Sequence, residues 1–215
     1  MFTTRQKFIV PGAVLAGVSV FLVVACLMDV PPFENSAHSG NIETADICES
    51  LGSQVEAAKD LRSLLPEAAT YSFQETPGTR ADSSRGTYTS ACFARSENRI
   101  LMSARTEMMR AEPPRGWAKA EVFDGQQNSD EYHSFPAGDK GLVSPTQAAV
   151  FVPCLADGKV PGGEYNLSVI VQLKQAVESS EDEARKKLTE LTVRAAKFAH
   201  QDAGCGLPSR LPAQP

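Results

Sequence analysis

The 215-residue sequence has few of the side chains that usually bind metals or carry out catalysis. It contains three histidines, and no two of its five cysteines have Cys-x-x-Cys spacing, which argues against a zinc site. The Gly-x-Ser-x-Gly, Walker A, Gly-x-Gly-x-x-Gly and His-Glu-x-x-His motifs are absent. We therefore expect no cofactor, no metal and no catalytic residue.

The chain has no excess of positive charge, since 26 acidic residues outnumber 21 basic ones and the formal net charge is −5. Arg5 and Lys7 against Asp29 give residues 1–30 a net +1, which leaves −6 for the rest of the chain. This acidic balance argues against nucleic acid as a partner and against adhesion to anionic lipid headgroups.

Charge is missing altogether from residues 8–28, FIVPGAVLAGVSVFLVVACLM. As a helix this stretch is roughly 31 Å long, close to the hydrocarbon thickness of a bilayer. Arg5 and Lys7 precede it and Asp29 and Glu34 follow it, which predicts a single-pass protein of the cell membrane with a cytoplasmic N-terminus. The expected segments are a cytoplasmic tail (1–7), a transmembrane signal-anchor (8–28), a linker (29–45), an extracytoplasmic domain (46–206) and a flexible tail (207–215).

Cys26 leaves a second kind of anchor open. The run Leu22-Val23-Val24-Ala25-Cys26 resembles a bacterial lipobox, in which the cysteine is lipidated and becomes the new N-terminus. The alternative is a small apolar residue inside the membrane helix, which the apolar residues after Cys26 favour. In both cases the exported domain is tethered to the outer face of the membrane.

Hydrophobic periodicity predicts two helices in the exported part. Apolar residues recur every three or four positions over residues 47–65, up to Pro66. Ser180 and Glu183 have capping-box spacing and begin a second helix, which Gly204 ends. The expected strands are a short one at 71–73, a hairpin of 87–95 and 99–107, a buried strand at 148–153 and an alternating strand at 165–173.

This order of elements predicts an α+β fold, a two-layer domain in which a mostly antiparallel sheet packs against two helices. The stretch from Trp117 to Phe123 fits either a short helix or an edge strand. Residues 108–145 form a long irregular segment, and we expect binding specificity to reside there, since such segments in compact domains are usually functional or disordered.

The four cysteines outside the membrane segment predict two disulfides, because they form an even number in an oxidising compartment. If strand 165–173 pairs antiparallel with strand 148–153, a C-terminal helix running back along the sheet brings Cys205 to the edge where Cys154 lies. The same reasoning brings Cys48 of the first helix to Cys92. We favour Cys48–Cys92 with Cys154–Cys205. The alternative is Cys48–Cys205 with Cys92–Cys154.

Four further features are candidate sites with an ordinary structural alternative. His133, beside carboxylates and Ser134, has the side-chain type for general acid–base work but fits a solvated loop better. His200 is expected to contact carbonyls near a helix end. Trp117 is expected to be a core anchor rather than a ligand-stacking ring. Arg105, Arg110 and Arg115 are either a small anion-binding patch or separately solvated cations.

The overall pattern combines a basic N-terminus, one membrane segment, Cys48 opening a helix, Cys92 in a strand, Val152-Pro153-Cys154 ending another, and a helix closing with Gly204-Cys205. This pattern resembles uncharacterised actinobacterial (streptomycete-type) membrane-anchored cell-envelope proteins. The resemblance implies a small α+β domain without an established activity, so no catalytic residues are carried over from it.

We predict a membrane-tethered extracytoplasmic binding or interaction module of the bacterial cell envelope. Its partner would be an envelope protein or a small ligand. A lipoprotein that captures a small envelope ligand is the first alternative, and it needs lipidation at Cys26. An envelope hydrolase centred on the His133 loop is the second.

Overall fold

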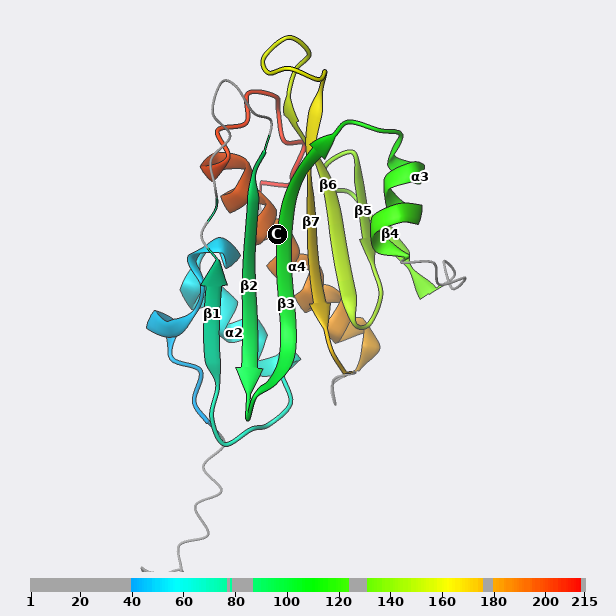
Figure 1. Ribbon diagram of the computed structural model, residues 1–215. Helices are drawn as coiled ribbons and strands as arrows, with labels where there is room; N and C mark the ends of the chain where they lie inside the picture. The colour runs from blue at the N-terminus through cyan, green and yellow to red at the C-terminus, as the bar shows by residue number, and fades with distance from the viewer. Residues whose placement is uncertain (1–39, 77, 79–86, 124–130, 176–179, 214–215) are drawn as a thin grey trace, which may run out of the picture. The chain divides into compact units, whose positions relative to one another are not determined.

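The computed structural model describes residues 40–76, 78, 87–123, 131–175 and 180–213 (Figure 1). The predicted membrane segment 8–28 and Cys26 lie outside these residues. Within the described ranges, no helix is long and apolar enough to cross a membrane.

Among the described residues, seven strands form one sheet in the order β1-β2-β3-β7-β6-β5-β4. Every neighbouring pair runs antiparallel, which confirms the predicted α+β class. The strands are β1 (Ser72–Thr76), β2 (Thr89–Ser96), β3 (Arg99–Arg110), β4 (His133–Phe135), β5 (Lys140–Val143), β6 (Gln147–Leu155) and β7 (Tyr165–Leu173).

The β2–β3 hairpin turns through two residues. Glu97 and Asn98 both have positive φ, 48° and 64°, which is the backbone of a type I′ turn and matches the twist of the two strands. β3 continues to Arg110, beyond the predicted end at residue 107, because its second half pairs with β7 as far as Tyr165. β3 thereby joins the two halves of the sheet.

Helices α2 (Gln54–Leu64) and α4 (Glu181–Asp202) pack on one face of the sheet, as predicted (Figure 1). Ser180 Oγ caps α4 by accepting from the Glu183 backbone N–H at 3.3 Å. A third helix, α3 (Pro114–Trp117), continues into a π-helical turn, η3 (Ala118–Val122), and lies on the opposite face. The predicted two-layer arrangement is therefore incomplete, since the sheet carries helices on both faces.

The predicted first helix is broken near its start. Two 3₁₀ turns, η1 (Thr44–Asp46) and η2 (Glu49–Leu51), precede α2, and Gly52 between η2 and α2 has a φ of +81°. This left-handed residue interrupts the helix. Val55, which the sequence places on the apolar stripe, is 66 % exposed, whereas Leu51 and Leu61 are fully buried.

Two hydrophobic clusters hold the layers together. The larger lies between the sheet and α2 and α4 and includes Leu61, Leu167 and Leu188. The smaller lies under α3 and η3 and is centred on Trp117 and Phe151. β7 is consequently buried on both faces, although its sequence alternates between apolar and more polar residues.

The described part of the predicted flexible tail, 207–213, lies against the domain. The Gly138 backbone N–H donates to the Arg210 carbonyl at 3.1 Å, and Lys197 Nζ donates to the Ala213 carbonyl at 2.8 Å. Leu211 packs against the larger cluster. These contacts extend the folded domain past residue 206.

Candidate functional site

The sheet has one face that the helices leave partly uncovered. In the described part of the chain, no helix lies over β1, β2 and β3 on the side opposite α2 and α4 (Figure 1). Strand alternation explains which side chains this exposes, since Cys92 and Ala94 face the helices and are fully buried, whereas the alternate residues Phe93 and Arg95 are half-buried. The open face, as defined by alternation and register, comprises Ser72, Gln74 and Thr76 of β1, Thr89, Ala91, Phe93 and Arg95 of β2, and Ile100, Ser103, Arg105 and Glu107 of β3.

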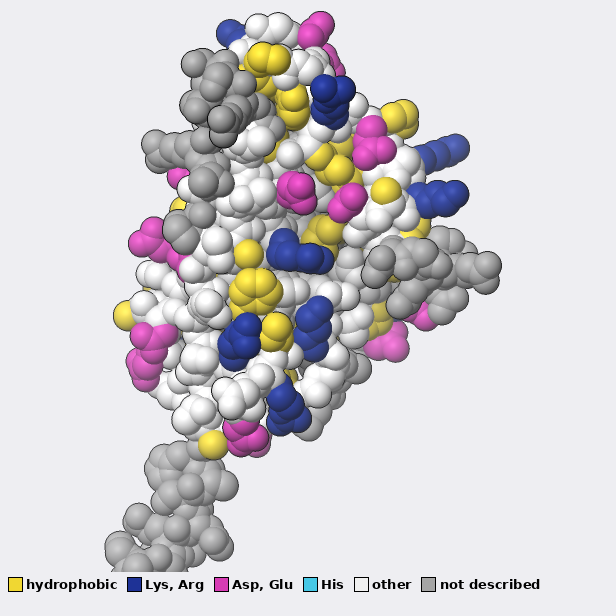
Figure 2. Space-filling model, in the orientation of Figure 1, with side chains coloured by type: hydrophobic (Ala, Val, Ile, Leu, Met, Phe, Trp, Pro, Cys, Tyr) yellow, Lys and Arg dark blue, Asp and Glu magenta, His cyan; other side chains and the backbone are white. Residues whose placement is uncertain are grey.

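Three cations lie on this surface. Register pairs Ala91 with Arg105 and places Arg95 beside Ile100, so both arginines lie on the open face. Lys174, just past β7, joins them because its Nζ donates to Gln172 Oε1 at 2.7 Å, and Gln172 pairs with Ser103. Figure 2 shows basic side chains over the middle of this face with hydrophobic side chains among them. Arg95, Arg105 and Lys174 are hereafter the basic cluster.

The charges of the basic cluster are not neutralised within the described part of the chain. None of the three cations lies within 4.0 Å of a described carboxylate. The Arg95 guanidinium lies 5.9 Å from the centre of the Phe93 ring, a cation–π contact that leaves its charge in place. The cluster therefore presents positive charge beside a partly exposed aromatic ring.

A depression with about 220 Å³ of water-accessible space adjoins Arg105. Ala91 and Ile170 supply apolar lining, Glu107 lies on the same strand as Arg105, and Glu121 belongs to η3. Helix η3 thus stands beside the sheet as a wall of this depression. π-Helical turns often occur at functional sites, which singles out this part of the predicted specificity segment.

Trp117 fixes that wall and has no role as an exposed ligand-stacking ring. The ring is fully buried, stacks on Phe151 with ring centres 5.0 Å apart, and donates from Nε1 to Ser168 Oγ at 2.9 Å. A Trp117 packed in this way ties α3 to both β6 and β7, so it is the core anchor that the sequence favours.

Arg105, Arg110 and Arg115 do not form one patch. Arg105 and Arg110 are five residues apart on a part of β3 that has no register shift, and there an odd separation places two strand residues on opposite faces. Arg115 lies on α3. The cations that do accompany Arg105 are Arg95 and Lys174, which only the strand register identifies.

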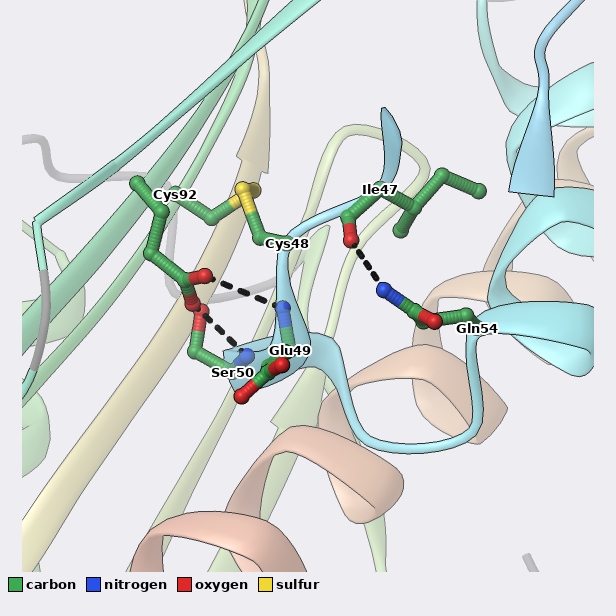
Figure 3. Close-up of a disulfide and its surroundings, with 7 residues drawn as sticks. Ile47, Cys48, Glu49, Ser50, Gln54 and Cys92 are labelled. Atoms are coloured by element: carbon green, nitrogen blue, oxygen red, sulfur yellow. Dashed lines mark hydrogen bonds between the residues drawn. A yellow bond between two sulfur atoms is a disulfide. The ribbon is translucent and has the colours of Figure 1, made fainter. Parts of the chain in front are cut away.

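The structure joins Cys48 to Cys92 (Figure 3) and Cys154 to Cys205, the pairing that the sequence favours. Near the first bond, the Glu75 carboxylate accepts from the backbone N–H groups of Glu49 (3.1 Å) and Ser50 (2.8 Å). The two bonds attach the chain before α2 and the chain after α4 to the sheet. These cysteines are structural, because a disulfide leaves no thiolate for chemistry.

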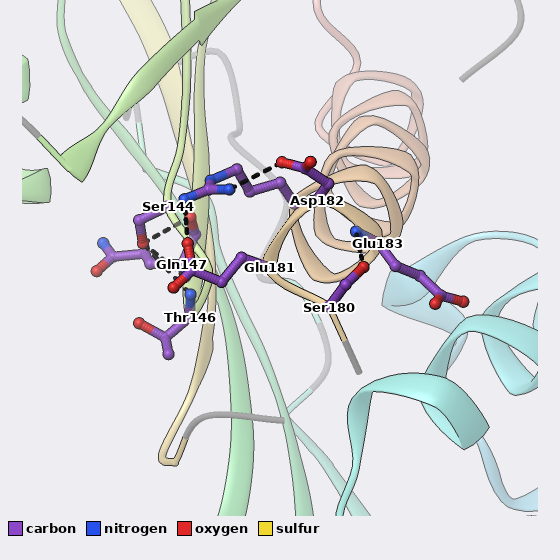
Figure 4. A network of polar contacts seen from close by, with 8 residues as sticks. Ser144, Thr146, Gln147, Ser180, Glu181, Asp182 and Glu183 are labelled. Atoms are coloured by element: carbon purple, nitrogen blue, oxygen red, sulfur yellow. Dashed lines mark hydrogen bonds and ion pairs between the residues drawn. The ribbon is translucent and has the colours of Figure 1, made fainter. Parts of the chain in front are cut away.

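His133 lies on the short edge strand β4 and is exposed. It shares a cleft with Thr146 and with Glu181 and Arg185 from the start of α4. Arg185 is already paired, with Glu181 at 2.7 Å and Asp182 at 3.1 Å (Figure 4). The His133 side chain makes no hydrogen bond to another described residue, so the described residues do not assemble a general acid–base arrangement around it.

His200 has a structural position at the end of α4. Its Nε2 donates to the Leu207 carbonyl at 3.0 Å. Burial lowers the pKa of His200, while hydrogen bonds to the Leu207 and Pro153 carbonyls oppose this effect. Nowhere in the described ranges are three or more His, Cys, Asp or Glu side chains placed to hold a metal ion.

No protein-family model, curated protein or solved structure matches this chain. The resemblance to actinobacterial envelope proteins therefore stays a prediction from the sequence, and function has to be inferred from the surface itself.

Proposed function

We propose that the chain is a membrane-tethered extracytoplasmic binding module of the bacterial cell envelope and that it binds its partner through the open face. The uncharged stretch 8–28 and its flanking charges support the tether. The two disulfides support an oxidising compartment. The observation that carries the binding role is the basic cluster beside Phe93.

An uncovered face does not by itself indicate binding, since antiparallel sheets commonly have one solvated face. The side chains on this face are what indicate binding. Arginine and aromatic side chains contribute most of the energy in protein interfaces, and here Arg95 and Arg105 accompany Phe93 and Ile100, both half-buried. Truncating such side chains removes affinity without disturbing a core.

Site-specific photo-crosslinking in the native host tests this proposal. A photoreactive residue at Gln74, exposed on the open face, should give a discrete adduct that disappears when Arg105→Glu is added. The matched control is Lys186, exposed on α4, which should give none. Equal adducts from both positions, or none from either, would contradict binding through the open face.

The depression beside Arg105 supports the alternative of a lipoprotein that captures a small envelope ligand. Its volume of about 220 Å³ is below that of drug-sized sites, so the ligand would be small. Native mass spectrometry of the chain extracted from its own membranes separates the two functions. A mass that includes residues 1–25, with a bound protein, supports the tethered module, whereas a lipidated Cys26 terminus with a small adduct supports the alternative. Cys26→Ser should block processing only in the second case.

A further inference from the structure

We propose that the occupant of the open face is an acidic polypeptide segment, bound in an extended conformation over β2 and β3. This proposal rests on the proposed function, since it names the chemistry of the partner at the same surface. Its central observation is that the three cations of the basic cluster share one sheet face in a chain with a net charge of −5.

Charge complementarity gives the sign of the partner. The open face of β1, β2 and β3 carries one carboxylate, Glu107, and that carboxylate is two residues past Arg105. The rest of the chain is acidic, so an anionic segment is repelled elsewhere and attracted here. Such a field both raises the association rate and orients the encounter.

Spacing gives the length of the partner. Arg95 pairs with Ile100 and Ala91 pairs with Arg105, so the two arginines are four residues apart along β2, which corresponds to about 14 Å in a strand. An extended segment of five or six residues covers that distance. Carboxylates near its two ends would then reach Arg95 and Arg105, and Lys174 lies beside Gln172 to take a third.

The side chains between the cations suit a polypeptide. Phe93 and Ile100 are half-buried and can cover one apolar side chain of the partner. Gln74 and Gln172 offer amide groups that can bond to a peptide backbone. Glu107 and Glu121, at the Arg105 end, disfavour further acidic residues and so limit how far the acidic part of the segment extends.

Two other anionic partners fit this surface less well. Glu121 of η3 and Ile170 of the sheet line one depression, so a helix stands beside the floor that carries Arg105. A flat bilayer cannot bring its headgroups to a floor beside such a wall, whereas an extended peptide is narrow enough. Nucleic acid requires a larger excess of positive charge than three cations in an acidic chain.

Fluorescence anisotropy with labelled peptides tests the proposal on the full-length oxidised chain in a nonionic detergent. The probes are an alternating glutamate decapeptide with one central leucine and its counterpart with glutamine at every glutamate position. We expect the acidic peptide to bind at least about tenfold more tightly and to weaken as salt is raised, because exposed charges are screened. Equal binding of the two peptides would overturn the proposal.

Charge reversal locates the site. Arg95→Glu with Arg105→Glu should weaken binding of the acidic peptide at least about tenfold, since repulsion replaces attraction. Lys59→Glu with Lys186→Glu changes the net charge equally on exposed positions of α2 and α4, and should leave the affinity within about twofold. Circular dichroism checks that both variants fold. An equal loss in the two variants would overturn the site.

Phosphatidylglycerol vesicles are the third probe. Binding to these vesicles that Arg95→Glu with Arg105→Glu removes, without binding of the acidic peptide, would assign the face to lipid and overturn the proposal. An adduct at Gln74 in cells without binding of the acidic peptide would keep the open face as a binding surface and remove only the acidic class.

Discussion

Asp60 of α2 and Arg194 of α4 form an ion pair beneath the surface of the helical layer. The Asp60 side chain is 2 % exposed and also accepts from Lys187 Nζ at 2.9 Å. One carboxylate therefore attaches α2 to two positions on α4. Both cations lose much of their hydration in this arrangement, so each depends on Asp60 for compensation.

Asp60→Asn should destabilise the domain by about 3 kcal/mol, because it leaves two largely buried cations without their shared partner. Urea unfolding followed by circular dichroism measures this loss. The matched control is Glu190→Gln, which removes the other carboxylate of Lys187, at 3.1 Å and 21 % exposed. That change should lower stability by at most about 1 kcal/mol. Equal losses of stability from the two changes would show that Asp60 contributes no more to stability than Glu190 does.

Tyr88 should make the domain sensitive to alkali. Burial raises the pKa of Tyr88 to about 12, and its hydroxyl donates to Asp202 Oδ2 at 3.0 Å. In the unfolded chain the phenol ionises near pH 10, so the stabilisation is complete below pH 10 and is lost as the pH rises towards 12. The stability difference between wild type and Tyr88→Phe should shrink over this window in urea unfolding at pH 8 and pH 11. A difference that does not change with pH would contradict the assignment.

His200 should make the folded domain less stable at acid pH, whereas Tyr88 makes it less stable at alkaline pH. Because burial lowers its pKa in the folded state, the unfolded chain takes up a proton first as the pH falls below about 6.5. Stability from neutral His200 is therefore complete above that pH and declines below it. His200→Gln, which keeps a donor for the Leu207 carbonyl, should lose less stability between pH 7.5 and pH 5 than wild type. An identical decline in both proteins would exclude His200 as the cause.

The sequence predicts those elements whose pattern extends over many residues. α4 has a capping serine and a long apolar stripe, and β7 has a regular alternation, so both are confirmed. β4 and β5 are missing from the prediction because they are short, and the exposed residues His133 and Ser134 form a strand only by pairing with Val143 and Leu142. Gly52 escapes notice because the apolar spacing continues across it, although its positive φ breaks the helix.

The basic cluster is not accessible from sequence because register determines it. The sequence suggests a three-residue turn, 96–98, whereas the structure has two turn residues and a register shift between Ala94 and Arg95. Each such change moves a strand residue to the other face. The alternative of a patch shared by Arg105 and Arg110 is therefore wrong, and nothing in the sequence pattern places Arg95 near Arg105.

The two disulfides should each stabilise the domain substantially. Cys48–Cys92 and Cys154–Cys205 join residues 44 and 51 positions apart, and closing loops of this size in the unfolded chain is worth about 4 kcal/mol each. Replacing either pair by alanine should lower the melting temperature by about 10 °C for a domain of this size.

The two replacements should differ in where the chain opens. Without Cys154–Cys205, the segment after α4 keeps only non-covalent contacts such as the Gly206 and Leu207 N–H bonds to the Cys154 carbonyl, so limited proteolysis should cut there first. Without Cys48–Cys92, cleavage should begin before α2 instead. Cys26→Ser serves as the control, since Cys26 takes part in neither bond, and reductant should reproduce the loss of both disulfides in wild type. An unchanged melting temperature in both double variants would show that the disulfides add no stability to the fold.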